Sequence, residues 1–359
     1  MAQNNNISIE GSTCPLPLQH NDIIVMGHGS GGRMTQELIQ QFFIPHFANE
    51  FLLQGNDAAK VTLPGIANLK GHLSLSTDSH IVNPLFFPGG DIGRLAVCGT
   101  VNDVSMLGAI PLYLTAGFIL EEGFPTETLE RVLVSMQQAA HEAGVQIVSG
   151  DTKVVEKGKA DGLFINTAGL GWIPSGRLIG GANAQPGDIV LLSGNIGDHG
   201  VAVLSARGEL GLQTEVRSDI APLNSMIQAV LVVAPHVHVL RDPTRGGLAT
   251  TLNEIAVQSQ VSVWLEEKNI PIQPAVRAVS EMLGLDPLYI ANEGKVIVIL
   301  PSQEADAALA VMRASPYGLN ATRIGEVKDS PVGRLLLKTS FGSTRILDVL
   351  TGEMLPRIC

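Results

Sequence analysis

The sequence predicts an α+β (mixed α/β) protein of two domains. Its 359 residues exceed the usual size of one domain, and 45% apolar with 16% charged residues is typical of an ordered chain with a large core. Strand-like and helix-like patterns alternate twice, on either side of a proline- and glycine-dense connector. The predicted parts are a flexible extension over 1–22, a first domain over 23–174, a second domain over 175–348 and a mobile tail over 349–359.

The elements of the first domain follow from the spacing of apolar residues. Leucines and serines alternate around 73–78, which predicts a strand. Pro125 favours a helix start and Gly144 a helix end, so a long amphipathic helix is expected between them. The apolar run 145–149 is expected to be a short buried strand. The other predicted strands are 22–26, 112–120 and 163–172, and the other predicted helices are 34–43 and 91–107.

The second domain repeats this rhythm without an obvious sequence repeat, and 332–348 is predicted to close it as a hairpin. Its predicted strands are 188–193, 237–240, 261–266, 296–300 and 321–327. Its predicted helices are 199–208, 221–233, 247–256, 274–284 and 303–314.

Composition also limits the partners. A net charge of −11 argues against nucleic acid and anionic membrane. A phosphate ligand is still compatible with it, because backbone N–H groups or a metal ion can hold one. An odd number of widely spaced cysteines indicates a reducing compartment without disulfides: Cys14, Cys98 and Cys359. The N-terminus lacks a secretory pattern, and the uncharged run 104–120 is broken by glycine and proline, so a soluble cytoplasmic protein is expected.

Residues 27–32 form a glycine-rich loop of the form G-x-G-x-x-G. A P-loop is excluded because Arg33-Met34 stands where lysine and a hydroxyl residue are required. A dinucleotide-binding fold is disfavoured because no clear second strand precedes Glu50. A glycine-rich backbone ahead of a helix can still present N–H donors to an anion, although a flexible connector would look the same. The candidate cofactor-binding residues here are His28, Gly29, Ser30, Gly31 and Gly32.

Three aspartates, Asp78, Asp103 and Asp151, follow or interrupt apolar elements of the first domain. A carboxylate in such a place is costly unless it is paired or binds a metal. Oxygen ligands of this kind, together with phosphate oxygens, suit Mg²⁺. Lys153 lies two residues beyond Asp151, and its side chain could reach a phosphate bound with the metal. A single aspartate of this type is usually a helix cap or turn residue, but three in one predicted domain favour a metal site.

The chain ends on Cys359, so its thiol is expected on a mobile arm. A thiolate is a good nucleophile and can carry a covalently attached group. An incidental terminal residue is the alternative.

Several motifs together are specific enough to identify a family. They are His28-Gly-Ser-Gly-Gly32, Ser76-Thr-Asp-Ser79, Asn83-Pro-Leu-Phe-Phe-Pro-Gly-Gly-Asp91, Asn102-Asp-Val104, Gly150-Asp-Thr-Lys-Val-Val155, Gly197-Asp-His-Gly200, Arg241-Asp-Pro-Thr-Arg-Gly-Gly247, Asn292-Glu-Gly-Lys295 and Pro356-Arg-Ile-Cys359. With them, the chain resembles the hydrogenase expression/formation HypE family, in the superfamily of aminoimidazole ribonucleotide synthetase and selenophosphate synthetase. The resemblance runs from about residue 26 to the end.

The resemblance implies a homodimer whose N-terminal sheets pair into a barrel, with ATP and Mg²⁺ bound near that interface. It also implies an ATP-dependent carbamoyl dehydratase, which converts an S-carbamoyl group on Cys359 to a thiocyanate. The carbamoyltransferase HypF would load the tail, and a HypC–HypD iron scaffold would receive the cyanide for [NiFe]-hydrogenase. We expect Glu293 to act as the base and Lys153 to stabilise transferred charge. Asp78, Asp103 and Asp151 would bind metal and phosphate, with Asn102 and Thr152 beside them.

Two alternatives stay open at this point. One is another ATP-using member of the superfamily, such as a selenophosphate synthetase or a thiamine monophosphate kinase, which needs no terminal cysteine. The other is a nucleotide-regulated scaffold, for which ATP binding without turnover would suffice.

Overall fold

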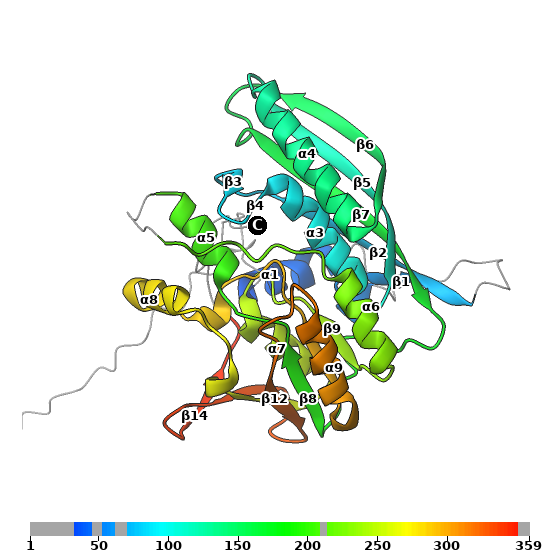
Figure 1. The fold of residues 1–359 in the computed structure, drawn as a ribbon, viewed down its shortest axis with the longest axis vertical. Helices are drawn as coiled ribbons and strands as arrows, with labels where there is room; N and C mark the ends of the chain where they lie inside the picture. The colour runs from blue at the N-terminus through cyan, green and yellow to red at the C-terminus, as the bar shows by residue number, and fades with distance from the viewer. Residues whose placement is uncertain (1–31, 45–51, 62–69, 209–213, 351–359) are drawn as a thin grey trace, which may run out of the picture.

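The computed structural model describes residues 32–44, 52–61, 70–208 and 214–350. They form a mixed α/β structure with two sheets, each with its own layer of helices, which confirms the predicted fold class (Figure 1). The predicted extension 1–22, the strand 22–26, the loop residues 27–31 and the tail residues 351–359 lie outside the described residues.

The N-terminal sheet has the strand order β1-β2-β7-β5-β6. Its bounds are Ala59–Val61 for β1, Gly71–His80 for β2, Leu163–Pro174 for β7, Ile110–Glu121 for β5 and Gln146–Val155 for β6. All neighbours are antiparallel except β5 and β6, which are parallel and are joined by the helix α4 (Thr126–Ala143). A small hairpin of β3 (Phe86–Phe87) and β4 (Gly90–Asp91) precedes the helix α3 (Ile92–Ser105).

The start of α3 is fixed by Asp91, whose carboxylate accepts hydrogen bonds from the backbone N–H groups of Gly93 and Arg94 at 2.8 and 3.1 Å. The helix is buried almost all round because it packs on β2 and β7, on α4 and on the second domain. The start of α4 follows Pro125 and its end is at Gly144, which adopts a left-handed conformation with φ of 70°. Both features of α4 agree with the sequence prediction.

Two parts of this sheet differ from the prediction. The stretch 145–149 was expected to be a short buried strand, but β6 has 10 residues and is exposed along nearly its whole length. The reason is that β6 is an edge strand, so neither its outer edge nor its faces are fully covered. The strand β1 was not predicted, since it lies in a stretch without an apolar period.

The C-terminal sheet has the order β14-β13-β10-β12-β8-β11-β9. Its strands are β8 (Asp188–Leu192), β9 (Val239–Arg241), β10 (Ser262–Glu266), β11 (Ile297–Pro301), β12 (Thr322–Lys328), β13 (Arg334–Lys338) and β14 (Thr344–Leu347). Its helices are α5 (Asp198–Ala206), α6 (Asn224–Val233), α7 (Gly247–Gln258), α8 (Pro274–Leu283) and α9 (Ser302–Ala314). The predicted final hairpin is confirmed by the antiparallel pair of β13 and β14.

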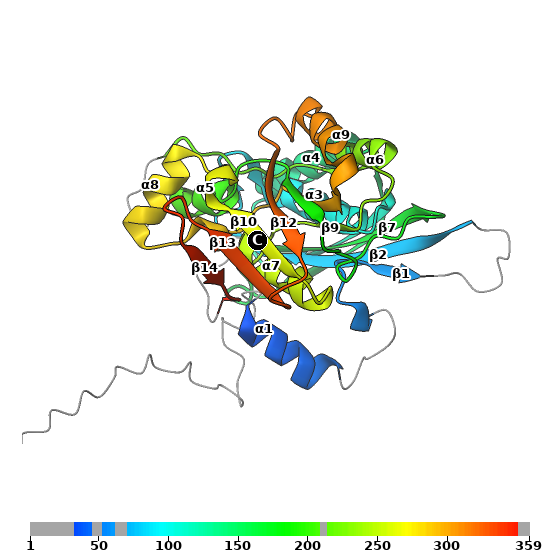
Figure 2. The ribbon, with the colours of Figure 1, turned by 90° about the horizontal axis from the view of Figure 1, so that it is seen from below.

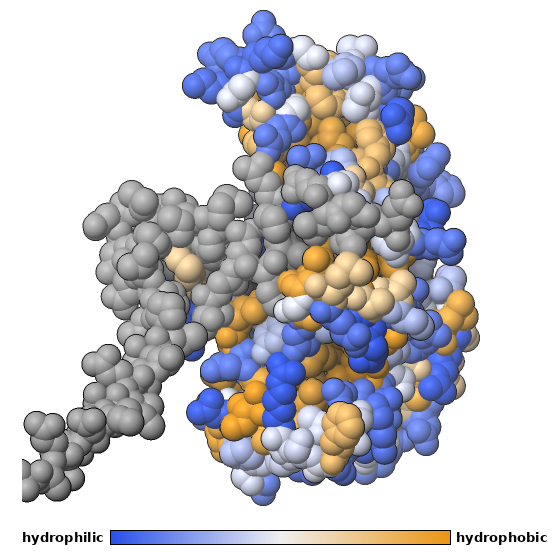
Figure 3. Space-filling view, turned by 90° about the vertical axis from the view of Figure 1, so that its left-hand side faces the viewer, coloured by the Kyte–Doolittle hydropathy of each residue, from blue (hydrophilic) through white to orange (hydrophobic). Residues whose placement is uncertain are grey.

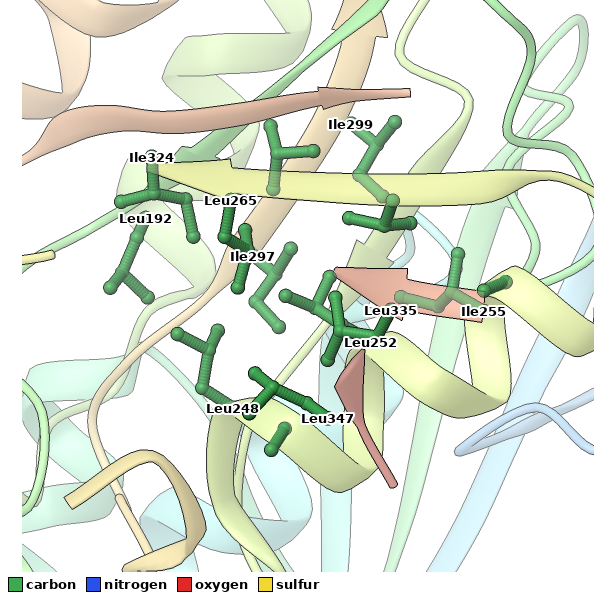
Figure 4. Packing of buried hydrophobic residues seen from close by; sticks show 14 of the residues in the cluster. Leu192, Leu248, Leu252, Ile255, Leu265, Ile297, Ile299, Ile324, Leu335 and Leu347 are labelled. Atoms are coloured by element: carbon green, nitrogen blue, oxygen red, sulfur yellow. The ribbon is translucent and has the colours of Figure 1, made fainter. Parts of the chain in front are cut away.

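The core of this domain lies between α7 and the sheet. Leu248 and Leu252 of α7 point toward Ile297, Leu335 and neighbouring aliphatic residues, all of them fully buried (Figure 4). This packing anchors the start of α7 and with it the loop that joins β9 to α7, which lines the candidate site.

The predicted helix 34–43 is observed as α1 (Arg33–Leu38) followed by a π-helical turn (Ile39–Phe43). It lies outside the two sheets, on the lower side of the molecule in Figure 2. None of the helices within the described ranges is long and apolar enough to cross a bilayer.

Candidate functional site

An acidic cavity of about 210 Å³ opens where the two domains meet. Its lining residues are Asp57, Thr77, Asp78, Ser79, Gly99, Asp103, Asp242, Thr244, Arg245 and Glu293. Five of these side chains are carboxylic acids and one is a guanidinium. The first domain supplies three of the acids from the segment before β1, from β2 and from α3. The second domain supplies the other two from the end of β9 and from the segment before β11.

The structure brings together three of the residues predicted from the sequence: Asp78, Asp103 and Glu293. Asp78 lies near the end of β2, and its Oδ1 is 3.8 Å from the nearest guanidinium nitrogen of Arg245. Asp103 projects from the last turn of α3, and its Oδ2 lies 2.9 Å from the hydroxyl of Ser76. Glu293 is only 5% exposed.

The carboxylates of this cavity outnumber the arginines beside them, Arg241 and Arg245. Burial raises the pKa of Asp103 well above its ordinary value, and the negative charges of Asp242 and Asp78 raise it further. Burial likewise raises the pKa of Glu293 well above its ordinary value, again with Asp78 adding to the effect. Burial raises the pKa of Asp242 to about 7, with Asp57 as the next cause. A cation in the cavity would relieve this repulsion.

The donor set fits Mg²⁺ that is shared with phosphate oxygens. Among the residues that the structure describes, no three His, Cys, Asp or Glu side chains converge as a complete metal site. Mg²⁺ is usually held by one or two carboxylates plus substrate phosphates and water, so Asp78 and Asp103 suffice as its protein ligands.

Sequence reasoning missed Asp57 and noted Asp242 only as a member of the motif Arg241–Gly247. Asp242 could have been found, because it directly follows β9, and an acid at the end of a strand is a candidate site residue. Asp57 lies in a stretch without a periodic pattern of apolar residues, so the sequence offered no signal for it. Behind the cavity, the guanidinium of Arg241 lies 2.8 Å from Asp57 and 2.8 Å from Glu254. Gln36 of α1 donates to Glu254 at 3.2 Å, which connects α1 to this wall.

Three predicted site residues lie on β6, away from the cavity: Asp151, Thr152 and Lys153. Asp78 of β2 pairs with Thr167 of β7, Thr167 pairs with Ala116 of β5, and Ala116 pairs with Gly150 of β6. Gly150 directly precedes Asp151. Three strand spacings of about 4.8 Å therefore separate Asp151 from Asp78, roughly 14 Å. Asp151 and Lys153 pair with each other at 3.0 Å, and both side chains are 70% exposed. Within one chain, these residues do not reach the cavity.

Asn102, expected beside the cofactor, does not line the cavity in this structure. Asn102 is 1% exposed, and its side chain is occupied by backbone groups. Its Nδ2 donates to the carbonyl oxygens of Ala221 at 3.0 Å and Glu293 at 3.4 Å, and its Oδ1 accepts from Leu223 N–H at 2.8 Å. The polar motif around Asp103 gave no sign that the two neighbours point in different directions.

Of the glycine-rich loop, only Gly32 is described; His28, Gly29, Ser30, Gly31 and the terminal Cys359 lie outside the described residues. Gly32 is buried against Leu350, which is the last described residue and the second residue of the predicted tail. The loop end and the tail start are therefore neighbours.

The chain matches two family descriptions: "AIR synthase related protein, N-terminal domain" over residues 55–173 and "AIR synthase related protein, C-terminal domain" over residues 185–338. It is 57% identical over 336 residues to "Carbamoyl dehydratase HypE" of Cupriavidus necator, covering 94% of this chain and 95% of that protein.

Two solved structures are also similar. "Crystal structure of HypE-HypF complex" aligns with a TM-score of 0.82 and 50% identity, covering 87% of this chain and 99% of that one. "Crystal Structure of Hydrogenase Maturation Protein HypE in complex with ATP" aligns with a TM-score of 0.77 and 52% identity, covering 94% of this chain and all of that one. With these identities over nearly its whole length, the chain belongs to the carbamoyl dehydratase HypE family of the AIR synthase superfamily.

Proposed function

We propose that this protein uses ATP to dehydrate an S-carbamoyl group on Cys359 to a thiocyanate, whose cyanide becomes an iron ligand of [NiFe]-hydrogenase. The observation that carries the proposal is the acidic cavity, which Glu293 lines together with the two aspartates suited to hold a metal and phosphate. Family membership and an ATP-bound relative support the same assignment.

The proposed reaction begins with attack of the carbamoyl oxygen on the γ-phosphorus of ATP, from which ADP leaves. The carbamoyl oxygen can then depart as phosphate, which is a better leaving group than hydroxide. The nitrogen then loses both protons, the C≡N bond forms, and the former carbamoyl oxygen departs with phosphate. The products are the thiocyanate, ADP, phosphate and one net proton.

Residues of the cavity fit these steps. Glu293 would accept a proton from the carbamoyl nitrogen. Burial, and next the charge of Asp78, raise the pKa of Glu293, which makes the ionised carboxylate a stronger base. Asp78 and Asp103 would hold Mg²⁺, which when bound neutralises charge on the phosphate oxygens. Arg245 supplies a further positive charge at the same wall. Loss of bulk water from the cavity would strengthen each of these interactions.

We also propose a homodimer in which Asp151, Thr152 and Lys153 act on the cavity of the second copy. Two observations support it: β6 is an edge strand, and the sheet has many exposed apolar side chains. These residues are Leu75, Leu112, Tyr113, Ile119, Ile147, Val148 and Val154. Apolar surface is visible on the upper part of the face drawn in Figure 3.

The partners proposed for the pathway are HypF as the source of the carbamoyl group and a HypC–HypD scaffold as the acceptor of cyanide, all in the cytoplasm. A relative solved in complex with HypF supports the first of these. The HypC–HypD scaffold rests on the family resemblance alone.

Peptide mass spectrometry of the C-terminal peptide tests the proposal. The protein is incubated with carbamoyl donor and HypF, then with Mg-ATP or Mg-ADP. We expect one carbamoyl group on Cys359, then loss of one water only with ATP, and neither change in Cys359→Ala. An unmodified Cys359 beside active HypF and an ATP-binding protein would instead favour a superfamily kinase or synthetase. Carbamoylation without ATP turnover would favour the scaffold.

A further inference from the structure

The backbone around Glu293 is held on both sides. Its N–H donates to Asp219 Oδ1 at 3.1 Å, and its carbonyl oxygen accepts from Asn102 Nδ2 at 3.4 Å. Neither Asp219 nor Asn102 lines the acidic cavity. The side chain of Glu293 therefore enters the cavity from a main chain that other residues fix in place.

Asp219 is itself tightly engaged. Its side chain is 3% exposed, and its Oδ2 lies 2.9 Å from the Nζ of Lys295, whose side chain is 9% exposed. Lys295 also donates to the Gly294 carbonyl oxygen at 3.2 Å. Burying an ion pair costs much of what the attraction returns, so such a pair is weak evidence for a role in stability alone.

The two segments approach too closely for any residue but glycine at position 294. A Cβ built on Gly294 would lie 1.7 Å from the carbonyl oxygen of Asp219. Van der Waals contact requires roughly twice that separation. Three consecutive residues therefore contact Asp219. Glu293 donates its backbone N–H, Gly294 leaves room for the Asp219 backbone, and Lys295 supplies the positive charge.

Asp219 also lies between two bonds that cross the domain boundary. On one side, Ser218 N–H donates to the Pro88 carbonyl oxygen at 2.7 Å. On the other, Arg94 Nε donates to the Ile220 carbonyl oxygen at 3.3 Å. Pro88 and Arg94 belong to the first domain, which also carries Asp78 and Asp103. The segment 218–220 therefore links the Glu293 backbone to the domain that carries the metal-binding candidates.

We propose that Asp219, with Lys295 as its counter-ion, is a positioning residue that sets where the Glu293 carboxylate stands relative to Asp78 and Asp103. The inference rests on the proposed function, since it assigns a supporting residue to the proposed base. Its key step is the hydrogen bond from Glu293 N–H to Asp219, because a shift of about 1 Å in a reacting group can cost up to a hundredfold in rate.

The test measures single-turnover loss of water from carbamoylated protein at saturating Mg-ATP, together with the Kd for ATP. Asp219→Ala removes the acceptor, and we expect a rate loss of about tenfold or more with the Kd for ATP within about threefold of the parent. Asp219→Asn keeps an acceptor oxygen and should restore most of the rate. Asp188→Ala is the matched control: Asp188 is 3% exposed, accepts from Gln185 N–H at 2.8 Å and pairs with His238 at 2.8 Å. It lies away from the cavity and should leave the rate unchanged.

The double variant Asp219→Asn/Lys295→Met removes both charges and keeps the acceptor, so it decides the matter if Asp219→Ala does not fold. A rate near the parent supports the hydrogen bond as the positioning contact. A tenfold loss in the folded double variant, a parental rate in Asp219→Ala, or equal losses of rate and ATP affinity would overturn the proposal. Absence of water loss in the parent protein would reject the proposed function itself, and the inference with it.

Discussion

The backbone N–H of Arg33 donates a hydrogen bond of 2.9 Å to the carbonyl oxygen of Leu350. This bond joins the start of α1 to Leu350, the last described residue, at the beginning of the tail. Nearby, the Tyr289 hydroxyl donates to the Asp348 carbonyl oxygen at 2.7 Å. The tail thus departs from a fixed point that touches both the glycine-rich loop and the segment leading to Glu293. Nine further residues reach Cys359, a span of at most about 30 Å.

Replacing Gly32 is expected to disturb this departure point. A Cβ at Gly32 would lie 2.5 Å from the Leu350 carbonyl oxygen, so Gly32→Val must displace one of the two segments that are in contact. We predict faster amide hydrogen exchange at 348–350 and a several-fold slower loss of water from carbamoylated Cys359. Gly180→Ala is the control, because its Cβ would make only ordinary contacts at 3.5 Å or more. Parental exchange and rate in Gly32→Val would show that the contact does not hold the tail.

Glu293→Gln tests the proposed base. The amide has nearly the same shape but cannot accept the proton, so we expect the dehydration rate to fall by roughly 10²–10⁴-fold. ATP binding should be retained, because the change removes a negative charge from an acidic cavity. Glu281→Gln on the exposed face of α8 serves as the control. Dehydration at the parental rate in Glu293→Gln would remove Glu293 from the mechanism.

Asp242 gives a pH prediction. Its pKa rises from an ordinary 3.8 to about 7, chiefly through burial, so between these values the native state binds a proton that the unfolded state has lost. Unfolding then releases protons, and stability falls as pH rises through this window. We expect metal-free protein to be less stable to urea at pH 8 than at pH 6. Asp242→Asn should remove the part of this difference that arises between pH 6 and pH 7, about 1 kcal/mol.

Mg²⁺ should act in the opposite direction at high pH. It competes with protons for the carboxylates, so it should raise the urea midpoint more at pH 8 than at pH 6. Asp188→Asn, which changes a buried aspartate outside the cavity, is the control for the general effect of removing a charge. An Asp242→Asn protein with the parental pH dependence would show that this carboxylate does not titrate in the window.

The sequence predicted most elements of the fold because their signals are local. The Pro125 start and Gly144 end of α4 need no tertiary information, and the hairpin of β13 and β14 follows from alternation alone. The exposure of β6 could not be predicted, because burial of a short apolar run depends on which strand lies at the sheet edge. That property belongs to the topology and is not encoded in the run itself.

The site was predictable to a smaller extent, for a related reason. Asp78 and Asp103 were found because each acid follows or interrupts an apolar element, whereas Glu293 was identified through the family resemblance. Asp57 has no such context, and its place in the cavity depends on β1 pairing with β2. Asn102 looked equivalent to Asp103, yet neighbouring positions on a helix are about 100° apart and face different surroundings.

The placement of Asp151 leads to a test of the proposed dimer. If Asp151 completes the cavity of the second copy, then Asp78→Asn and Asp151→Asn should each be inactive alone but complement each other. A randomly mixed population has half heterodimers, and each heterodimer has one site with both changes and one with neither. Unfolding and refolding the two variants together should therefore recover roughly a quarter of the parental dehydration rate. If Asp151 acted within its own chain, every heterodimer site would carry one change and mixing would recover nothing. Lys153→Met in place of Asp151→Asn should give the same recovery, because both side chains project from the same stretch of β6.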